Sequence, residues 1–138
     1  MGATTTLVTL EEFQALPDKP GFKLELHEGM VVEMAGARLA HEIVKSNFND
    51  SLVVFSVSNR QLKVFNETSF ELSDELDYIP DVAVVLKDRL KGLDRAKHFQ
   101  GPPDIAIEVV SSETAAYLAR KIRRGRAISR RSCDSAWL

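Results

Sequence analysis

The 138-residue sequence has a single cysteine, Cys133, so it cannot form an intramolecular disulfide. This scarcity excludes the disulfide-rich secreted domains and fits a reducing cytosol. The sequence also lacks a secretory signal pattern after Met1, and no apolar run approaches the roughly 20 residues that a bilayer crossing requires. We therefore expect a cytoplasmic protein with no membrane segment.

A large excess of charge of one sign is also missing, because 18 basic and 20 acidic residues give a formal net charge of −2. The charges are nevertheless unevenly distributed. Residues 120–138 hold seven basic residues against one acid, Asp134. A basic segment of this kind fits contact with nucleic acid, and a solvated tail is the alternative interpretation.

The chain is long enough for one domain with one hydrophobic core, but too short for two. Apolar strand patterns alternate with helical patterns, so we expect a single α/β unit. The predicted domain spans residues 1–124. Residues 125–138 show neither helical nor strand periodicity and are predicted to form an irregular basic tail.

The first half of the chain predicts a short helix, a hairpin and a long helix. Residues 9–12 read TLEE, a capping box that begins a helix ending before Pro17. The segment FKLELHEGMVVEM alternates apolar and polar residues on either side of Glu28 and Gly29, a pattern typical of a hairpin. Over residues 38–55, apolar side chains recur every three or four positions and predict an amphipathic helix.

The second half contains the most apolar strands. DVAVVL and DIAIEVV are short, nearly continuous apolar segments, typical of strands that are covered on both faces and lie centrally in a sheet. QLKVFN and TSFELS predict a further pair of strands, and SSETAAYLARKIRR predicts a helix from about Glu113. The expected fold class is α/β, with a mixed central β-sheet flanked by helices.

Two acids accompany the central strands. Asp81 follows Pro80 at the start of the first strand, and alternation places Glu108 inside the second. A buried carboxylate is costly unless a cation or several donors meet it. The two acids could hold Mg²⁺, which lowers the pKa of a bound water and neutralises charge on a phosphate. The alternative is that Asp81 caps a strand and Glu108 pairs with a lysine or arginine inside the fold.

Several motifs occur in a fixed order: LELHEGMVVEM, AHEIV, IPDVAVV, PPDIAIEVVSSET and YLARK. In this order they resemble the Uma-two family of restriction endonuclease-like proteins, over about residues 9–124. The resemblance implies the PD-(D/E)XK, restriction-endonuclease-like fold. It also implies an endonuclease that depends on Mg²⁺ or Mn²⁺ and hydrolyses phosphodiester bonds in DNA.

The resemblance also implies roles for single residues. Asp81 matches the acid of the PD element and Glu108 the acid of the second element, so both are expected to bind the metal, with the backbone carbonyl of Val109 as a further ligand. The family pattern's lysine would normally stand at Val110. Lys121 matches a lysine displaced to the following helix, where it would orient the attacking water or stabilise the transition state. A solvent-facing lysine is the alternative.

Two further site residues follow from the same resemblance. Glu25 matches a glutamate on the first strand that binds the metal or orients a metal-bound water, although an ordinary outward-facing residue is the alternative. His41 matches a histidine at the start of the long helix that would shuttle a proton or contact phosphate, with capping or packing as the alternative. His27 and His98 match no motif and are expected on the surface.

The chain departs from the family after residue 124, where the family continues with a tyrosine, a glycine turn and strands containing a tryptophan. A second class of function therefore stays open: a catalytically impaired remnant or nucleic-acid-binding module that retains the nuclease fold. A metal-independent hydrolase has little support, because no serine or cysteine nucleophile lies in a matching context. Nucleases of this fold often act as dimers that cut both strands, so DNA and a second copy of the chain are the expected partners.

Overall fold

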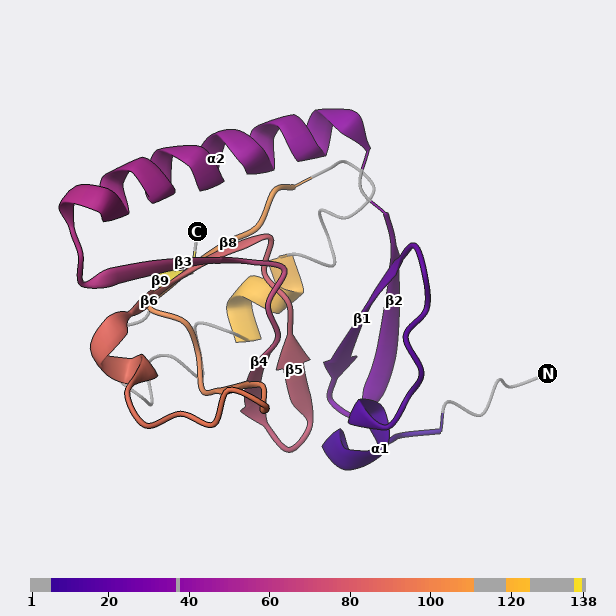
Figure 1. Ribbon diagram of the computed structural model, residues 1–138. Coiled ribbons are helices and arrows are strands. Elements are labelled where there is room, and N and C mark those ends of the chain that lie inside the picture. Colours follow the sequence, from indigo (N-terminus) through magenta and orange to yellow (C-terminus); the bar gives the residue numbers. More distant parts are fainter. Residues whose placement is uncertain (1–5, 37, 111–118, 125–135, 138) are drawn as a thin grey trace.

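The computed structural model describes residues 6–36, 38–110, 119–124 and 136–137. Within them the strands form two sheets, and a long helix lies along the second sheet (Figure 1). The first sheet has the order β2-β1-β5-β4-β7, formed by Met30–Ala35, Phe22–His27, Leu76–Tyr78, Phe70–Ser73 and Phe99–Gln100. The second sheet has the order β3-β6-β8-β9, formed by Leu62–Asn66, Val82–Leu86, Ile105–Ile107 and Ala136–Trp137. The β4-β7 and β8-β9 pairs are parallel and the others antiparallel, which confirms the mixed α/β fold class.

The N-terminal predictions are confirmed. Helix α1 (Leu10–Gln14) begins with the predicted capping box, because the Glu12 N–H donates to Thr9 Oγ1 at 3.2 Å and the Thr9 N–H donates to Glu12 Oε2 at 2.8 Å. Strands β1 and β2 form the predicted hairpin. Its two turn residues, Glu28 and Gly29, have φ values of 51° and 77°. A two-residue turn that matches the twist of its strands requires this left-handed backbone.

The central position of the apolar strands is also confirmed. Strand β6 lies between β3 and β8, and residues 82–85 are all buried. Phe70 of the first sheet packs against Ala83 and Val85 of the second, so one hydrophobic cluster joins the two sheets. A second cluster joins Tyr78 of β5 to Ala106 of β8.

The helix at residues 119–124 is held by this second cluster, because Ile122 packs against it. The helix was predicted to begin near Glu113, but residues 111–118, including Tyr117, lie outside the described part of the chain. Since Lys121 precedes Ile122, the same packing fixes the position of the lysine relative to both sheets.

Helix α2 (Leu39–Ser58) confirms the predicted long helix and contacts β3 and β6. None of its residues is fully buried. Most of its large apolar side chains are exposed: Leu39, Ile43, Val44, Phe48, Val53, Val54, Phe55 and Val57. The amphipathic pattern therefore predicted the helix correctly, although the described residues cover its apolar side chains only in part.

Two details differ from the sequence predictions. Strand β8 ends at Ile107, so Glu108 follows the strand instead of lying inside it, although it is buried at 8% exposure. Residues 136–137 form strand β9, parallel to β8, within the segment that was predicted to be irregular. A neighbouring strand supplies hydrogen bonds that no periodicity in the tail's own sequence can reveal.

None of the helices in the described residues combines the length and the apolar character needed to cross a bilayer.

Candidate active site

The fold brings three ionisable side chains from distant elements into one buried cluster. Lys121 of the helix at residues 119–124 is fully buried. Its Nζ lies 2.6 Å from Oε1 of Glu25 on β1 and 2.5 Å from Oε1 of Glu108 after β8. It also donates to the carbonyl of Ile79 at 3.3 Å. A lysine amine has three N–H donors, and this one has three acceptors around it.

Glu25 is fully buried and holds the cluster together. Its Oε1 accepts a hydrogen bond from the Ile79 N–H at 2.9 Å, and its Oε2 lies 2.8 Å from Nε2 of His27. Burial alone would raise the pKa of Glu25, but Lys121, His27 and Lys23 outweigh it and lower the pKa to about 2. This carboxylate is therefore ionised at neutral pH.

Glu108 behaves in the opposite way. Burial outweighs the attraction of Lys121 and Lys23 and raises the pKa of its carboxyl to about 7. Burial would lower the pKa of Lys121, but the two glutamates outweigh it and raise the pKa. At neutral pH the cluster thus contains a charged lysine, a charged Glu25, and a Glu108 that is partly protonated.

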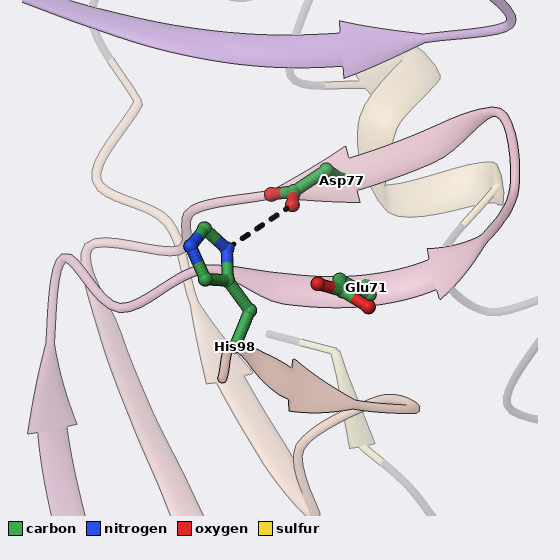
Figure 2. A group of neighbouring side chains, drawn as sticks. All are labelled: Glu71, Asp77 and His98. Atoms are coloured by element: carbon green, nitrogen blue, oxygen red, sulfur yellow. Dashed lines mark ion pairs between the residues drawn. The ribbon is translucent and has the colours of Figure 1, made fainter. Parts of the chain in front are cut away.

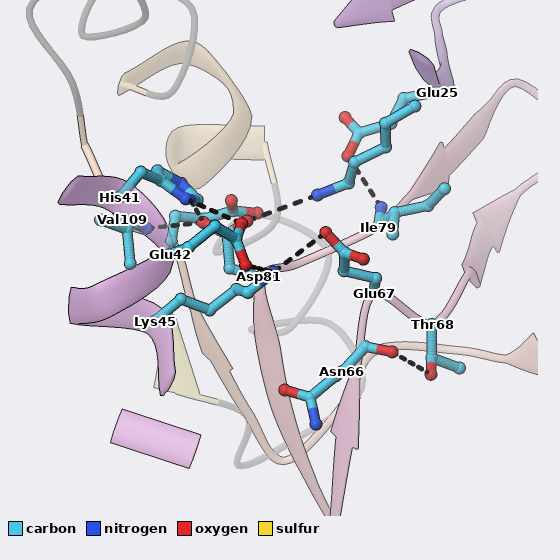
Figure 3. Close-up of polar contacts among 12 residues, drawn as sticks. Glu25, His41, Glu42, Lys45, Asn66, Glu67, Thr68, Ile79, Asp81 and Val109 are labelled. Atoms are coloured by element: carbon cyan, nitrogen blue, oxygen red, sulfur yellow. Dashed lines mark hydrogen bonds and ion pairs between the residues drawn. The ribbon is translucent and has the colours of Figure 1, made fainter. Parts of the chain in front are cut away.

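Asp81 lies directly before β6 and is 5% exposed. Its Oδ2 accepts a hydrogen bond from the Val109 N–H at 2.7 Å and lies 3.2 Å from Nε2 of His41 (Figure 3). Its Oδ1 lies 3.6 Å from the ammonium of Lys23. Val109 directly follows Glu108 in the chain, so this hydrogen bond places Asp81 close to the segment that carries Glu108. The predicted role of the Val109 carbonyl stays a prediction.

Helix α2 presents a polar edge to this site. His41 reaches Asp81 from its first turn, and Lys45 follows one turn later. The ammonium of Lys45 lies 2.8 Å from Glu42 and 3.2 Å from Glu67 (Figure 3). The site is therefore bordered by cationic and hydrogen-bonding groups as well as by acids.

The predicted residues occupy one region in two contact groups. Asp81, His41 and Val109 form one group, and Glu25, Glu108 and Lys121 form the other. Lys23 links them, because it pairs with Asp81 and also influences the pKa of both glutamates. The carboxylates have the oxygen chemistry that Mg²⁺ prefers. Glu108, whose proton leaves near neutral pH, could replace its contact with Lys121 by one with a cation.

The site acids do not converge on a single point. In the described part of the chain, just one set of three His, Cys, Asp or Glu side chains has its ligand atoms within 4.8 Å of one another, and it is Glu71, Asp77 and His98. Asp81 and Glu108 have the ligand chemistry of a cation site, but the ammonium groups of Lys23 and Lys121 now lie against their carboxylates.

The sequence analysis missed two residues of the site. Lys23 was not considered, and His27 was expected on the surface but is 4% exposed and lies against Tyr78, with ring centroids 4.3 Å apart. Lys23, Glu25 and His27 alternate along β1 and therefore share one face. Three polar residues at period two on a strand were the signal that could have found them. His98, by contrast, is exposed as expected.

Comparisons with known proteins identify the fold and the family. No curated protein matches the sequence. The structure is similar to a crystal structure from Anabaena variabilis described as "a putative nuclease belonging to DUF820", with a TM-score of 0.70 and 20% sequence identity over 86% of this chain and 67% of that chain. Residues 10–124 match the Uma2 family, described as "Putative restriction endonuclease". This match spans nearly all of the segment in which the motifs occur, and the chain belongs to the Uma2 family.

Proposed function

We propose that this protein is a divalent-metal-dependent nuclease that hydrolyses phosphodiester bonds in DNA. The observation that best supports the proposal is the burial of Lys121 against Glu25 as well as Glu108, because a lysine paired with Glu108 alone is what the structural alternative to a metal site requires. A fully buried lysine between two carboxylates is an expensive arrangement for a merely structural role, because hydrophobic residues of similar volume often stabilise a core as well or better. Perturbed, paired ionisable groups of this kind cluster at functional sites.

Asp81 and Glu108 are the proposed metal ligands, together with the Val109 carbonyl. When bound, Mg²⁺ or Mn²⁺ would lower the pKa of a water and neutralise charge on the phosphate. Glu108, with its pKa near 7, would bind the cation after losing its proton. Lys121 would then donate hydrogen bonds toward the attacking water or the phosphate oxygens, while Glu25 holds its amine in place.

His41 and Lys45 are the proposed phosphate contacts. Both side chains are partly buried on the edge of α2 that faces Asp81 and Glu67. His41 already lies within hydrogen-bonding distance of Asp81. An imidazole at this position could relay a proton during the reaction.

Cleavage of supercoiled plasmid DNA with and without Mg²⁺ tests the proposal. We expect nicking that requires the metal and that Asp81→Asn or Glu108→Gln abolishes, while calorimetry shows reduced Mg²⁺ binding in both variants. Glu33→Gln is the matched control, because Glu33 is an exposed acid of β2. Metal-dependent cleavage that survives Asp81→Asn at full rate would overturn the assignment.

A nucleic-acid-binding module without catalysis is the second candidate. It is favoured by how closely the Lys121 amine is surrounded: the amine donates to Glu25 and to the Ile79 carbonyl, forms an ion pair with Glu108, and would have to leave one of these groups to act on a substrate. DNA binding that persists in the presence of EDTA, with no cleavage under any metal condition, would support this candidate. Self-association into a homodimer stays a prediction that sedimentation analysis tests.

A further inference from the structure

A second group of ionisable side chains lies on the other face of the first sheet. Glu71 on β4, Asp77 on β5 and His98 before β7 place their ligand atoms within 4.8 Å of one another (Figure 2). Asp77 pairs in register with Leu26 and therefore shares its face. Because side chains alternate along a strand, Glu25 points to the opposite face. This cluster is thus separate from the Lys121 site.

The two carboxylates of the cluster are an unfavourable pair on their own. Glu71 and Asp77 are directly opposite each other in the antiparallel β4-β5 ladder, where like charges destabilise a sheet. Asp77 is fully buried, and its Oδ2 accepts no hydrogen bond in the structure. A buried acceptor without a partner carries a desolvation penalty. A cation between these groups would relieve both costs.

Neighbouring side chains already hold the two carboxylates in place. Gln14 of α1 donates from Nε2 to Oε1 of Glu71 at 2.6 Å, and Ser69 donates from Oγ to Oδ1 of Asp77 at 2.5 Å. Each contact fixes one oxygen of a carboxylate, and in Asp77 the second oxygen is the one that accepts no hydrogen bond. Hydrogen bonds from neighbouring side chains commonly orient the side chains that bind a metal.

The spacing of the nitrogen and the free oxygen suits a tetrahedral ion. Nδ1 of His98 lies 3.6 Å from Oδ2 of Asp77. This separation is too long for a good hydrogen bond. It is close to the roughly 3.3 Å that separates two ligands of a tetrahedral zinc ion with bonds of about 2.0 to 2.1 Å. His98 Nδ1 now lies 2.9 Å from Ser69 Oγ, so coordination would exchange that contact for the ion.

We propose that Glu71, Asp77 and His98 bind one Zn²⁺ ion, with the fourth position open to water. The imidazole ligand favours zinc over Mg²⁺, which prefers an all-oxygen environment. The side chain of His98 is 48% exposed, so an ion can reach the site from solvent. Asp77, Ser69 and His98 also line a cavity that opens beside α1. The bound ion would tie the segment before β7 to the first sheet.

Titration of the metal-free, full-length chain with ZnCl₂, followed by calorimetry and thermal unfolding, tests the proposal. We expect one equivalent of zinc to bind with micromolar or higher affinity and to raise the melting temperature, because a ligand that binds the folded state stabilises it. Excess Mg²⁺ should not displace it. Co²⁺ in place of zinc should give the visible absorption of a tetrahedral site.

Two variants decide between this cluster and the nuclease site. His98→Ala changes an exposed side chain and should leave the fold intact, yet it should remove the zinc-induced thermal shift and the cobalt spectrum. Asp81→Asn should keep both. Absence of zinc binding in the unaltered chain, zinc binding that His98→Ala leaves unchanged, or zinc binding that Asp81→Asn abolishes would each overturn the proposal. Asp77→Asn provides a second test of the zinc ligands. It keeps the shape of the side chain and the contact with Ser69, and it should also remove the zinc-induced thermal shift.

Discussion

The ammonium of Lys121 lies 2.6 Å from a carboxylate oxygen of Glu25, although 96 residues separate the two along the chain. Both side chains are fully buried. Their contact therefore joins the C-terminal helix to the first strand through charges that no water screens. Such a pair contributes little against an apolar replacement, but losing one partner leaves the other charge buried and unpaired.

Lys121→Met is therefore expected to destabilise the fold strongly. Removing the ammonium leaves Glu25 ionised in the core, and breaking a buried pair in this way costs about 3–5 kcal/mol. Urea unfolding followed by circular dichroism measures the loss. Lys63→Met, at an exposed position of β3, is the matched control, and we expect it to change stability by less than about 0.5 kcal/mol.

A double-mutant cycle with Glu25→Gln separates the pair from the lysine's other contacts. Because the two side chains touch, the combined effect should be smaller than the sum of the single effects. Additive losses would show that the ion pair contributes nothing of its own.

The raised pKa of Glu108 predicts a pH dependence of stability. Its carboxyl titrates near 4.5 when unfolded and at about 7 when folded, so the folded state binds more protons between these values. The stabilising contribution of Glu108 is therefore complete below pH 4.5 and is lost as the pH rises through 7. Glu108→Gln removes this loss. Relative to the unaltered chain, the variant should gain on the order of 3 kcal/mol between pH 5 and 8.

Denaturant unfolding of both proteins across this pH range measures the difference. For Glu75→Gln, at an exposed position outside the site, the free energy of unfolding should run parallel to that of the unaltered chain across this range. If the free energies of unfolding of the unaltered chain and of Glu108→Gln differed by the same amount at every pH in this range, burial would not raise the pKa of the Glu108 carboxyl.

The sequence predicted the elements that depend on local pattern. The capping box at Thr9, the turn at Glu28 and Gly29, and the buried strand after Asp81 all follow from short-range chemistry, and the structure has each of them. Family motifs named the residues of the site. The structure brings them into one region, and their catalytic roles stay predictions.

Contacts between distant elements could not be predicted in the same way. The pairing of Lys121 with Glu25 depends on how the C-terminal helix packs on the Tyr78 cluster, which no local periodicity encodes. His27 was misjudged because a histidine without a motif is more often exposed, whereas here Glu25 and Tyr78 surround it. The cluster of Asp77 and His98 likewise exists through strand pairing alone.

Two glycines with similar backbone conformations are expected to differ in how well they tolerate alanine. Gly29 and Gly21 have φ values of 77° and 79°, so alanine is strained at both. A methyl group at Gly29 would also lie 3.3 Å from Cβ of Leu7, whereas at Gly21 it would meet nothing within 4 Å. Gly29→Ala should therefore lower the melting temperature more than Gly21→Ala, and equal effects would show that Leu7 yields freely.

The basic C-terminal segment gives the last prediction, because its role depends on whether the chain binds DNA through it. Residues 120–138 contain seven basic side chains and one acid, so contact with phosphates would release counterions and make affinity fall with salt. Deleting the segment would also remove strand β9, which pairs with β8 beside Glu108. Replacing Arg130 and Arg131 by serine instead lowers the charge and leaves residues 136–137 unchanged.

If both arginines contact phosphates, the slope of log K against log salt should become shallower by about 0.9 for each. Fluorescence anisotropy with a labelled duplex between low and physiological salt measures this slope. Lys91→Ser, which removes one exposed charge elsewhere, is the control and should leave the slope unchanged. An unaltered slope in the double variant would show that these two arginines do not contact phosphates and that DNA, if bound, is held by residues of the folded domain.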